Sequence, residues 1–409
     1  MKRCWCGNKE LKLYSDEYYR CEKCKTLISA YDLENSIYNT ENEEHDLYGK
    51  NYWEVSMTKA AGKSTLSEVV DMYLTERVIY WLKYVLRYMK LGSEIAEIGC
   101  GLGQLQYVLK NLGYKQLAFE LSKEICNYME DNLGVDTHCG PFEENTRQYD
   151  GILAFDLFEH LLQPEEFMDK CNDSLREGGV LCMQTPCYAP EWTYEEMLQK
   201  GKKFQEQLKA EQHVYIYSKE SITHLLTEKG YSYIRFEPAF FGDDYDMFLF
   251  ASKSPLSENS GEEIEQYLNS VPSGRLVKAM ISLFDEKNRK TKECEAIDNE
   301  RKKILKDVET LTRLVDEKEK QTDKFRDAAE ERLASMERMA AENKMLQQAA
   351  DERLSDVERL LAENKVLQQA ADERLSDVER LLAENKILQQ AADERLAIIE
   401  KMTHAEETK

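Results

Sequence analysis

Glycine and proline are missing from the last third of this 409-residue chain, since neither occurs after residue 285. Glu, Lys, Arg, Ala, Gln and Leu dominate that part, a composition that excludes a globular core there and is typical of a long helix. Up to about residue 253, by contrast, the sequence has the aromatics and glycines of a folded domain. The chain is therefore expected to be globular first and fibrous afterwards.

The chain also lacks an excess of positive charge and any long apolar run. Its formal net charge of −23 disfavours a nucleic-acid partner. No run of 18 or more apolar residues occurs, so no membrane span is expected. The start, "MKRCWCGNKE", lacks the apolar stretch of a signal peptide, and the eleven cysteines are scattered. We therefore expect a cytoplasmic protein whose cysteines bind metal rather than form disulfides.

Two cysteine pairs near the start form a candidate metal site. In "CWCGNKELKLYSDEYYRCEKC" they are Cys4 with Cys6 and Cys21 with Cys24. Two such pairs on hairpin turns can supply four thiolates to a tetrahedral Zn²⁺ ion, although the "CWC" pair is one residue closer than usual. We expect a zinc ribbon; the alternative is four reduced surface thiols near a chain end.

A long apolar periodicity follows this cysteine module. From Ser64 to about Lys90 apolar residues recur close to helical spacing, and Ser64 or Thr65 can cap the start, which predicts one helix. The preceding "HDLYGKNYW" (His45 to Trp53) clusters aromatics between charges. That segment is either a lid facing the substrate or a packing strip.

The stretch "SEIAEIGCGLGQ" raises the question of which cofactor its turn could hold. It is typical of strand, turn and helix, so that N–H groups at the helix N-terminus can meet a ligand. A dinucleotide needs GxGxxG, but here Gln104 occupies the third position and Gly103 falls one residue early. The pattern is ExGxGxG, from Glu97 to Gly103. S-adenosylmethionine has no phosphate and carries an ammonium group that an acidic Glu97 can hold, so the pattern favours that cofactor.

Further strands and helices alternate after the turn. Glu120 ends a second strand, "KQLAFELS", about twenty residues past the glycines, where a carboxylate can bind both hydroxyls of a ribose. "YDGILAFDLFEHLLQPEEFMDKCNDSLREGGVLCMQTP" then predicts a strand at 151–155, a helix from Pro164, a Gly-Gly turn and another strand. This order predicts an α/β fold.

Together these segments resemble the class I S-adenosylmethionine-dependent methyltransferases. In that family a "yDxIxxxDxxEHxxxP" segment and an "LxxGGxLxxxTP" segment follow the cofactor turn in this order. The resemblance covers roughly residues 64–253 and implies a Rossmann-like, doubly wound, seven-stranded sheet. "CWCG", "CEKC", "LYGKNYW" and "QTPCY" are also similar to a bacterial subgroup associated with surface-polysaccharide clusters.

The resemblance implies which residues contact the cofactor. The glycine turn would surround its methionine end, Glu120 would hold the ribose, and the residues after the fourth strand would close over the sulfonium. "HCGPFEE" would lie against the adenine, where the family often has an acidic residue and this chain has Cys139 and Gly140. The implied cofactor-binding residues are Glu97, Gly99, Cys100, Gly101, Gly103, Glu120, Leu121, Gly140, Phe155, Asp156 and Leu157.

Methyl transfer to a hydroxyl needs alignment and a general base. His160, in "FDLFEHL", follows the fourth strand and is expected beside the methyl group, in a metal-free site with one histidine base. His213, in "AEQHVYIYS", is the alternative base, and Glu159 is the third catalytic candidate. Each could instead hold the backbone by hydrogen bonding.

Two further regions could meet the acceptor. The insertion over residues 187–212 is expected to form the acceptor wall. Three of its aromatic residues could stack on a sugar ring or simply pack: Tyr188, Trp192 and Tyr194. Three acidic residues are expected in a solvated turn, with sugar hydroxyls as the alternative partners: Asp243, Asp244 and Asp246.

The C-terminal part is repetitive. "AADERLSDVERLLAENKVLQQ" begins at Ala349 and recurs almost unchanged at Ala370, with a looser copy at Ala328 and a partial one at Ala391. The period is 21 residues, three heptads, which predicts a left-handed coiled coil and a homo-oligomer. Asn364 and Asn385 recur within the apolar seam, where a polar residue can fix the register. The alternative is a solitary charged helix held by Glu–Lys and Glu–Arg pairs.

The sequence thus predicts four parts: a zinc-ribbon-like module (1–45), a methyltransferase domain (46–253), a linker with a short amphipathic helix (254–289) and a coiled coil (290–409). The family likeness implies methylation of a carbohydrate hydroxyl, on a nucleotide sugar or a nascent surface glycan. A sugar C-methyltransferase is one alternative. Another is a scaffold that binds the cofactor weakly while its coiled coil recruits glycosyltransferases.

Overall fold

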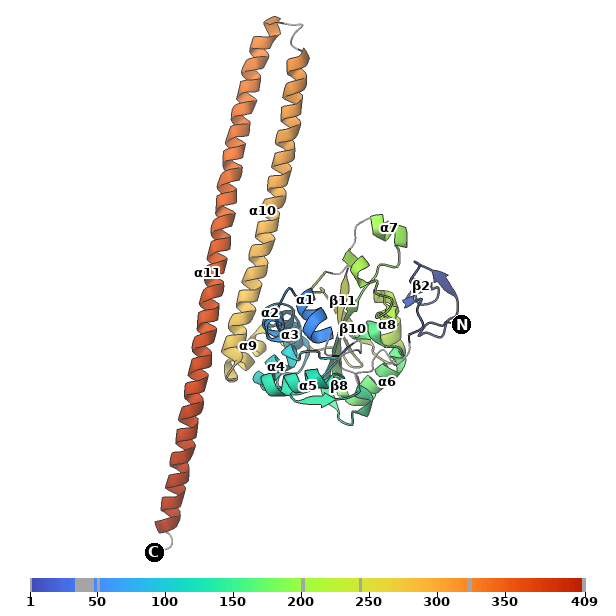
Figure 1. Cartoon of the computed structure of the whole chain (residues 1–409), viewed down its shortest axis with the longest axis vertical. Helices are drawn as coiled ribbons and strands as arrows, with labels where there is room; N and C mark the ends of the chain where they lie inside the picture. The colour runs from blue at the N-terminus through green and yellow to red at the C-terminus, as the bar shows by residue number, and fades with distance from the viewer. Residues whose placement is uncertain are drawn as a thin grey trace. The chain divides into compact units, whose positions relative to one another are not determined.

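The computed structural model describes residues 2–33, 48–49, 52–199, 203–242, 245–321 and 326–406. It divides into two compact units, residues 1–278 and residues 279–409 (Figure 1). Within the described ranges, no helix combines the length and the apolar character needed to cross a membrane.

A seven-stranded mixed sheet forms the centre of the first unit. Its strand order is β10-β11-β8-β7-β4-β5-β6, in which β4 to β8 run parallel and β11 and β10 join antiparallel. The strands are β4 (Glu94–Ile98), β5 (Lys115–Glu120), β6 (Thr137–Cys139), β7 (Tyr149–Phe155), β8 (Leu175–Pro186), β10 (Tyr233–Glu237) and β11 (Asp246–Ser252). The predicted α/β class and the seven-stranded, Rossmann-like sheet are confirmed.

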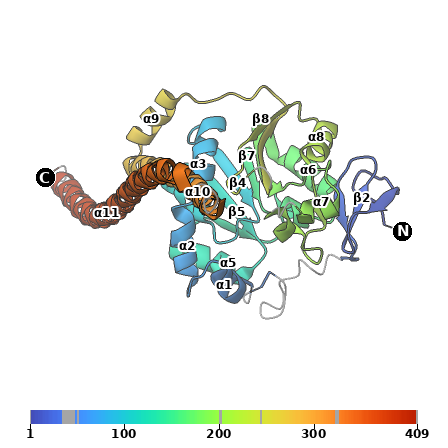
Figure 2. The same cartoon turned by 90° about the horizontal axis from the view of Figure 1, so that it is seen from above.

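Helices cover both faces of this sheet (Figure 2). They are α2 (Leu66–Leu74), α3 (Arg77–Tyr88), α4 (Gln104–Asn111), α5 (Lys123–Tyr128), α6 (Pro164–Ser174) and α8 (Lys219–Glu228). Phe167 of α6 and Ile222 of α8 share one apolar cluster with Ile152 of β7. On the other face Val69 of α2 and Ile125 of α5 pack together. The sheet is therefore buried on both sides, as a parallel sheet requires.

The single helix expected from residue 64 is two helices. Thr65 and Glu68 form a reciprocal capping box at the start of α2, so the predicted cap is confirmed. The helix ends at Leu74, because Glu76 leaves the helical region with φ −126° and ψ −106° before α3 begins. The break lets α2 and α3 pack in different directions, which a continuous helix could not do.

A second, smaller sheet joins the N-terminal module to the domain that contains the seven-stranded sheet. It contains β1 (Leu11–Leu13), β2 (Tyr18–Cys21), β3 (Leu27–Ser29) and β9 (Tyr215–Ile216), in that order. The β3–β9 pairing is antiparallel, with Leu27 opposite Ile216. The module is thus continuous in hydrogen bonding with the domain that follows it.

The segment expected to be a linker is folded in part. It contains α9 (Gly261–Ser270), which begins with a capping box between Ser260 and Glu263. Just before this helix the Asn259 side chain donates hydrogen bonds to the carbonyl oxygens of Leu86 and Met89, at 2.8 and 2.7 Å. The chain is therefore fastened to the end of α3 before the long helices begin.

The second unit consists of two long helices rather than one rod. Helices α10 (Gly274–Gln321) and α11 (Arg326–Glu406) run antiparallel and side by side (Figure 1). Arg353 pairs with Glu300 at 2.7 Å, and Ile297 of α10 lies near Leu354 and Val357 of α11. The apolar residues of the repeats in this part of α11 therefore pack against α10 of the same chain. Every residue from 379 to 399 is exposed.

Candidate active site

The glycine turn between β4 and α4 has the backbone that its sequence predicts. Gly101 has φ 54° and Gly103 has φ 68°, in the left-handed region that side chains disfavour. A Cβ atom at Gly101 would lie 2.7 Å from Cη2 of Trp53, and one at Gly103 would overlap the sulfur of Met129. Both positions therefore require glycine for two reasons: the backbone has a positive φ, and a neighbouring side chain leaves no room for a Cβ atom.

The Glu120 carboxylate lies under this turn, at the end of β5. Its Oε2 accepts a hydrogen bond from the N–H of Gly101 at 3.1 Å. Its Oε1 accepts from the N–H groups of Leu121 and Ser122, at 2.8 and 3.1 Å. The carboxylate is therefore fixed beside the glycine turn, where the ribose of the cofactor is expected. Leu121 contributes its backbone to this arrangement.

Glu97 is the buried carboxyl at the end of β4, with only 4% of its surface exposed. Burial raises its pKa to about 8, and a hydrogen bond from the Gln106 amide at 3.0 Å opposes that rise. A buried acid of this kind can meet a cationic ammonium group, because the ligand would supply the missing charge. The arrangement fits the amino-acid end of S-adenosylmethionine.

Two other expected cofactor residues lie around the same turn. The N–H of Gly140, after β6, donates to the carbonyl oxygen of Glu120 at 3.0 Å, so Gly140 lies beside the residue that is expected to hold the ribose. Cys100 is 8% exposed and packs in an apolar cluster with Met129, its Sγ 3.6 Å from the methionine sulfur. Cys100 can therefore contribute its backbone, while its side chain belongs to the core.

The three residues at the end of β7 close on the turn from the other side. The Leu157 side chain lies 3.1 Å from the position of a Cβ on Gly99. Phe155 stacks on Trp81, with ring centroids 4.3 Å apart. Asp156 has a φ of 51° and accepts a hydrogen bond from the Gln184 amide at 2.9 Å. An aspartate held in this strained conformation is typical of a functional position.

Three side chains that the sequence analysis gave as alternative catalytic residues converge next to this part of the structure. Glu159 and His160 lie on the 3₁₀ turn η5 (Phe158–His160), and His213 comes just before β9. One nitrogen of each ring and one carboxylate oxygen lie within 4.8 Å of one another, and the ring centroids are 4.9 Å apart. We call these three residues the Glu–His–His cluster. Such a set of groups can accept a proton or hold a metal ion.

Burial controls the protonation of the cluster. It lowers the pKa of His160 to about 4 and that of His213 to about 3, so both rings are neutral at pH 7. Burial, and next the charge of Asp156, raise the pKa of Glu159 well above its usual value. The Glu159 Oε2 atom accepts a hydrogen bond from the Thr185 hydroxyl at 2.9 Å.

A residue outside the predicted site also touches the cluster. The Tyr48 hydroxyl lies 2.9 Å from Nδ1 of His160, and the Tyr48 carbonyl accepts from the indole N–H of Trp53 at 3.1 Å. Because Trp53 also covers Gly101, the bonded pair Tyr48 and Trp53 touches both the cluster and the glycine turn. The aromatic enrichment of "LYGKNYW" was the signal for it. His45, in the same quoted segment, lies outside the described residues.

Asp246 differs from its expected place. It is the first residue of β11, 1% exposed, and accepts a hydrogen bond from the Gln207 amide at 3.2 Å, so the solvated turn predicted for it is wrong. Burial and the charge of Asp156 raise its pKa to about 8. Asp243 and Asp244 lie outside the described residues.

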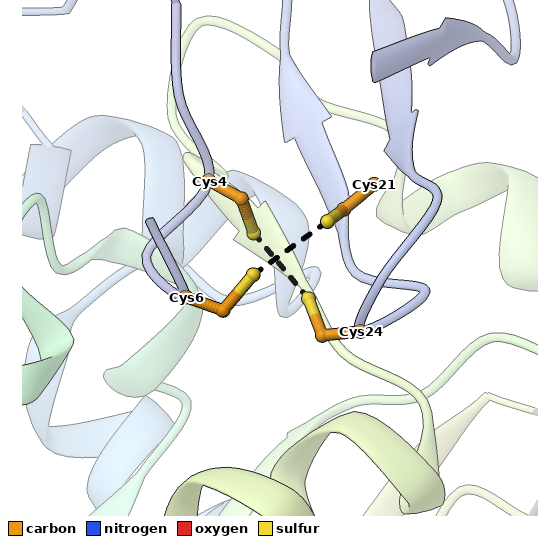
Figure 3. A group of neighbouring side chains, drawn as sticks. All are labelled: Cys4, Cys6, Cys21 and Cys24. Atoms are coloured by element: carbon orange, nitrogen blue, oxygen red, sulfur yellow. Dashed lines mark hydrogen bonds between the residues drawn. The ribbon is translucent and has the colours of Figure 1, made fainter. Parts of the chain in front are cut away.

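The four cysteines of the N-terminal module converge on one point (Figure 3). The Cys4 and Cys24 sulfurs are 3.4 Å apart, and those of Cys6 and Cys21 are 3.6 Å apart. All four Sγ atoms lie within 4.8 Å of one another, as four ligands of a tetrahedral ion would. The tighter "CWC" spacing therefore does not prevent convergence.

This module also supports the Glu–His–His cluster. The N–H of Ser29, at the end of β3, donates to the carbonyl oxygen of Val214 at 2.9 Å. The strand pair β3–β9 follows directly, so His213 precedes a strand that the module holds in place. The backbone position of His213 therefore depends on the cysteine module.

A pocket of about 400 Å³ lies between the module and the insertion. Its aromatic lining includes Tyr14 from the module and Tyr188, Trp192 and Phe204 from the insertion. Tyr188 is 2% exposed, and among the described residues its hydroxyl has no hydrogen-bond partner. Tyr194 lies beside this lining, with its ring 5.8 Å from that of Tyr14.

Comparisons with known proteins agree with this geometry. Residues 71–235 match a family model described as a methyltransferase domain. The ubiquinone biosynthesis O-methyltransferase of Xanthomonas oryzae pv. oryzae (strain PXO99A) is 27% identical over 114 residues, 25% of this chain and 48% of that protein. The protein of the same name from Xylella fastidiosa (strain M23) is 26% identical over 156 residues, 34% of this chain and 63% of that protein.

The chain thus spans about half the length of the first of these curated relatives. Among solved structures, the magnesium protoporphyrin IX methyltransferase of Synechocystis PCC 6803 aligns with a TM-score of 0.34 and 15% identity, over 50% of this chain and 97% of that one. The family match and the glycine turn together favour one class of protein, the S-adenosylmethionine-dependent methyltransferases. The match covers residues 71–235, which is less than half of the chain.

Proposed function

We propose that the chain transfers the methyl group of S-adenosylmethionine to a hydroxyl oxygen of a carbohydrate, on a nucleotide sugar or a nascent surface glycan. The observation that carries the proposal is the position of the Glu–His–His cluster. Two of its members, Glu159 and His160, come two and three residues after Leu157, whose side chain contacts Gly99 of the glycine turn. Groups that can take up a proton therefore lie next to the cofactor turn.

The residues of the turn would bind and orient the cofactor. Glu97 would face its ammonium group, Glu120 its ribose hydroxyls, and Gly140 the adenine side. Phe155, Asp156 and Leu157 would close over the sulfonium end. When bound, S-adenosylmethionine supplies an electrophilic methyl group, and most of the rate of its transfer comes from alignment.

His160 and His213 are the candidate bases for the acceptor hydroxyl. The Nδ1 atom of His160 lies 3.0 Å from the carbonyl oxygen of Gln212, and Nδ1 of His213 lies 2.7 Å from that of Gln207. In the tautomer that bonds to both carbonyl oxygens, each Nδ1 carries hydrogen and each Nε2 keeps its lone pair, and the Tyr48 hydroxyl oxygen near Nδ1 of His160 is then an acceptor. Each carbonyl would also stabilise the imidazolium formed when Nε2 takes a proton.

The carbohydrate acceptor is proposed from the aromatic pocket and from the likeness to the polysaccharide subgroup. Flat aromatic rings such as those of Tyr14 and Trp192 can stack on the apolar face of a sugar, and the Tyr188 hydroxyl can hydrogen-bond to it. An acceptor from ubiquinone biosynthesis is the second candidate. It is favoured by the names of the two bacterial relatives.

The N-terminal module is proposed to hold a structural Zn²⁺ ion through Cys4, Cys6, Cys21 and Cys24. Four protein ligands close the coordination sphere, which suits a structural role. Cysteines that bind metal rather than form disulfides are typical of a reducing compartment, so we place the protein in the cytoplasm.

Self-association through α11 is also proposed. Leu354 and Val357 are half-buried near α10, and the same repeat positions two repeats later are Leu396 and Ile399. Those two residues are each 57% exposed. An identical seam that continues past its partner helix favours pairing with a second copy of the chain. The resulting assembly could also recruit glycosyltransferases.

The proposal is tested by calorimetric titration with S-adenosylmethionine, followed by incubation with ¹³C-methyl-labelled cofactor and two acceptor panels, nucleotide sugars and phenolic quinone precursors. The carbon chemical shift of the product separates an O-methyl from a C-methyl group. Cofactor binding with an O-methyl sugar product supports the proposal. A C-methyl sugar or a methylated phenol as product would contradict the proposed sugar hydroxyl as the acceptor. A folded chain that binds no cofactor would contradict the proposed activity and favour a scaffold.

A further inference from the structure

The Glu–His–His cluster has the composition of an open metal site. We propose that Glu159, His160 and His213 hold a divalent first-row transition-metal ion, distinct from the ion proposed for the four cysteines. Its role in methyl transfer rests on the proposed function, whereas its binding does not. The proposal replaces the metal-free histidine site that the sequence predicts and the histidine bases considered above, because an Nε2 atom that ligates a metal ion cannot also take up a proton.

The orientation of both imidazole rings supports metal binding. Each Nδ1 is held by a backbone carbonyl oxygen, that of Gln212 for His160 and that of Gln207 for His213. This arrangement leaves Nε2 of each ring deprotonated and fixes the direction of the ring. Metal-ligating histidines are held in the same way, with the second nitrogen donating to a carbonyl or a carboxylate.

Glu159 supplies the third ligand. Its Oε1 lies 3.9 Å from Nε2 of His160, while its Oε2 accepts from the Thr185 hydroxyl. The Thr185 contact orients the carboxylate and leaves Oε1 directed at the histidine. Two atoms 3.9 Å apart are too far for a hydrogen bond, but an ion about 2.0–2.2 Å from each fits between them.

The burial of the cluster makes a bound cation favourable. Glu159 is 2% exposed and His213 is 5% exposed, so their polar atoms are almost withdrawn from water. A carboxylate at this depth is costly unless a positive charge lies beside it, and a bound cation would supply that charge.

Further hydrogen bonds hold His213 in place. The Gln207 side chain donates to Asp246 at 3.2 Å, while its carbonyl oxygen holds His213. The hydroxyl of Tyr18 donates to the carbonyl oxygen of His213 at 3.2 Å. The ring and the backbone of His213 are therefore both constrained, as a preorganised ligand should be.

The ligand set selects the class of ion. Imidazole nitrogen favours Zn²⁺, Fe²⁺, Ni²⁺ and related ions over Mg²⁺ or Ca²⁺, which prefer oxygen. Two histidines and one carboxylate leave positions open, as catalytic metal sites do. An acceptor hydroxyl at an open position would lose its proton to water more readily. The C–O bond would then form as the methyl C–S bond breaks, with the bonding pair left on sulfur.

Metal binding can be measured directly on the full-length chain. Mn²⁺ is the first probe, because it binds thiolates weakly and its free-ion electron paramagnetic resonance signal disappears on binding. Zn²⁺ is then added as a competitor. We expect one Mn²⁺ bound per chain and displaced by Zn²⁺. His213→Gln and Glu159→Gln should each weaken Mn²⁺ binding at least tenfold, whereas the control His224→Gln, on the half-exposed face of α8, should not.

Calorimetric binding of S-adenosylmethionine checks that each variant is folded, since no proposed cofactor residue is changed. Unaltered Mn²⁺ binding in His213→Gln and Glu159→Gln overturns the proposal, as does a wild-type chain that binds cofactor but no Mn²⁺ and no Zn²⁺ beyond the one ion expected at the cysteines. The latter result would leave the proposed methyl transfer intact. Conversely, Mn²⁺ binding that depends on His213, without methylation of any acceptor, would uphold the metal site and contradict the proposed function.

Discussion

The hydroxyl of Tyr18 donates a hydrogen bond to the carbonyl oxygen of His213, at 3.2 Å and across 195 residues of sequence. Tyr18 lies in β2 of the cysteine module and is fully buried. The bond therefore links the part of the chain expected to bind Zn²⁺ with the part expected to do chemistry. The cysteine module therefore helps to position a residue of the candidate active site.

Removal of this one donor should slow methyl transfer. Tyr18→Phe leaves the carbonyl oxygen of His213 buried without the hydroxyl, at a cost of about 1–3 kcal/mol. We expect kcat to fall roughly 3- to 30-fold if part of that cost appears in the positioning of His213. Steady-state kinetics of the variant, with the partly exposed neighbour Tyr19→Phe as control, measures the effect. Equal rates for both variants would show that the bond is only structural.

Loss of metal from the cysteines should act on the same histidine. Cys24→Ser removes one of the four ligands and should loosen the β3–β9 pairing and reduce turnover more than tenfold. The affinity for S-adenosylmethionine should change little, because the glycine turn lies on the other sheet. Metal content, calorimetry and turnover together check this. Cys294→Ser, in α10, is the matched control, and full turnover without metal would contradict the supporting role.

The ribose assignment of Glu120 predicts a loss of cofactor affinity. Glu120→Gln removes a charged acceptor for two hydroxyls, and hydrogen bonds to charged groups contribute about 1.5–3 kcal/mol each. The dissociation constant for S-adenosylmethionine should rise about 10- to 100-fold. The control is Glu143→Gln, an exposed carboxyl on η4 (Phe142–Glu144). Equal affinity of the two variants for S-adenosylmethionine would contradict the assignment of Glu120 to the ribose.

Glu97 predicts that cofactor binding releases a proton. Its pKa is raised to about 8, so the carboxyl is mostly protonated at pH 7, and an adjacent ammonium group should ionise it. Titrations in buffers of different ionisation enthalpy should show up to one proton released per cofactor. Glu97→Gln should abolish the release, and an unchanged release would exclude Glu97 as its source.

The same shift has a consequence for stability. Because the pKa is higher in the folded than in the unfolded chain, the contribution of Glu97 is full below about pH 4.5 and is lost as pH rises through about 8. Wild-type protein should therefore lose free energy of unfolding over this interval relative to Glu97→Gln. Denaturant titrations at several pH values measure the difference.

Charged substitutions in the exposed apolar seam of α11 should reduce the molecular mass of the assembly in solution. Leu396→Glu combined with Ile399→Glu places like charges on the proposed contact and should convert the oligomer to a monomer. Gln390→Glu with Ala397→Glu adds the same charge beside the seam and should not. Light scattering during gel filtration gives both masses. A wild-type chain that is already monomeric would contradict self-association.

The sequence was most informative where structure depends on neighbouring residues. Gly101, Gly103 and Glu120 belong to a strand–turn–helix–strand pattern whose geometry is local, and the structure has that pattern. The meeting of His160 with His213 is not local, since it depends on how β9 pairs with β3. Two residues that had been alternatives for one role therefore proved to be neighbours.

The C-terminal region shows a different difficulty. Its repeats predict heptads over residues 290–409, but they cannot say whether the seam meets another chain or folds back. The region contains two helices, α10 and α11, although no glycine or proline marks a turn between them. Asp246 is a similar case, because its polarity suggested solvent while the order of the sheet placed it inside.

The pairing of Ile28 with Tyr215 has a consequence for the nascent chain. β3 leaves the ribosome about 190 residues before its partner β9, which is roughly 10–40 s at ordinary rates of synthesis. During that interval the outer edge of β3 is an unpaired strand that could pair wrongly with another polypeptide. Early capture of Zn²⁺ would let the module fold before its docking strand is translated.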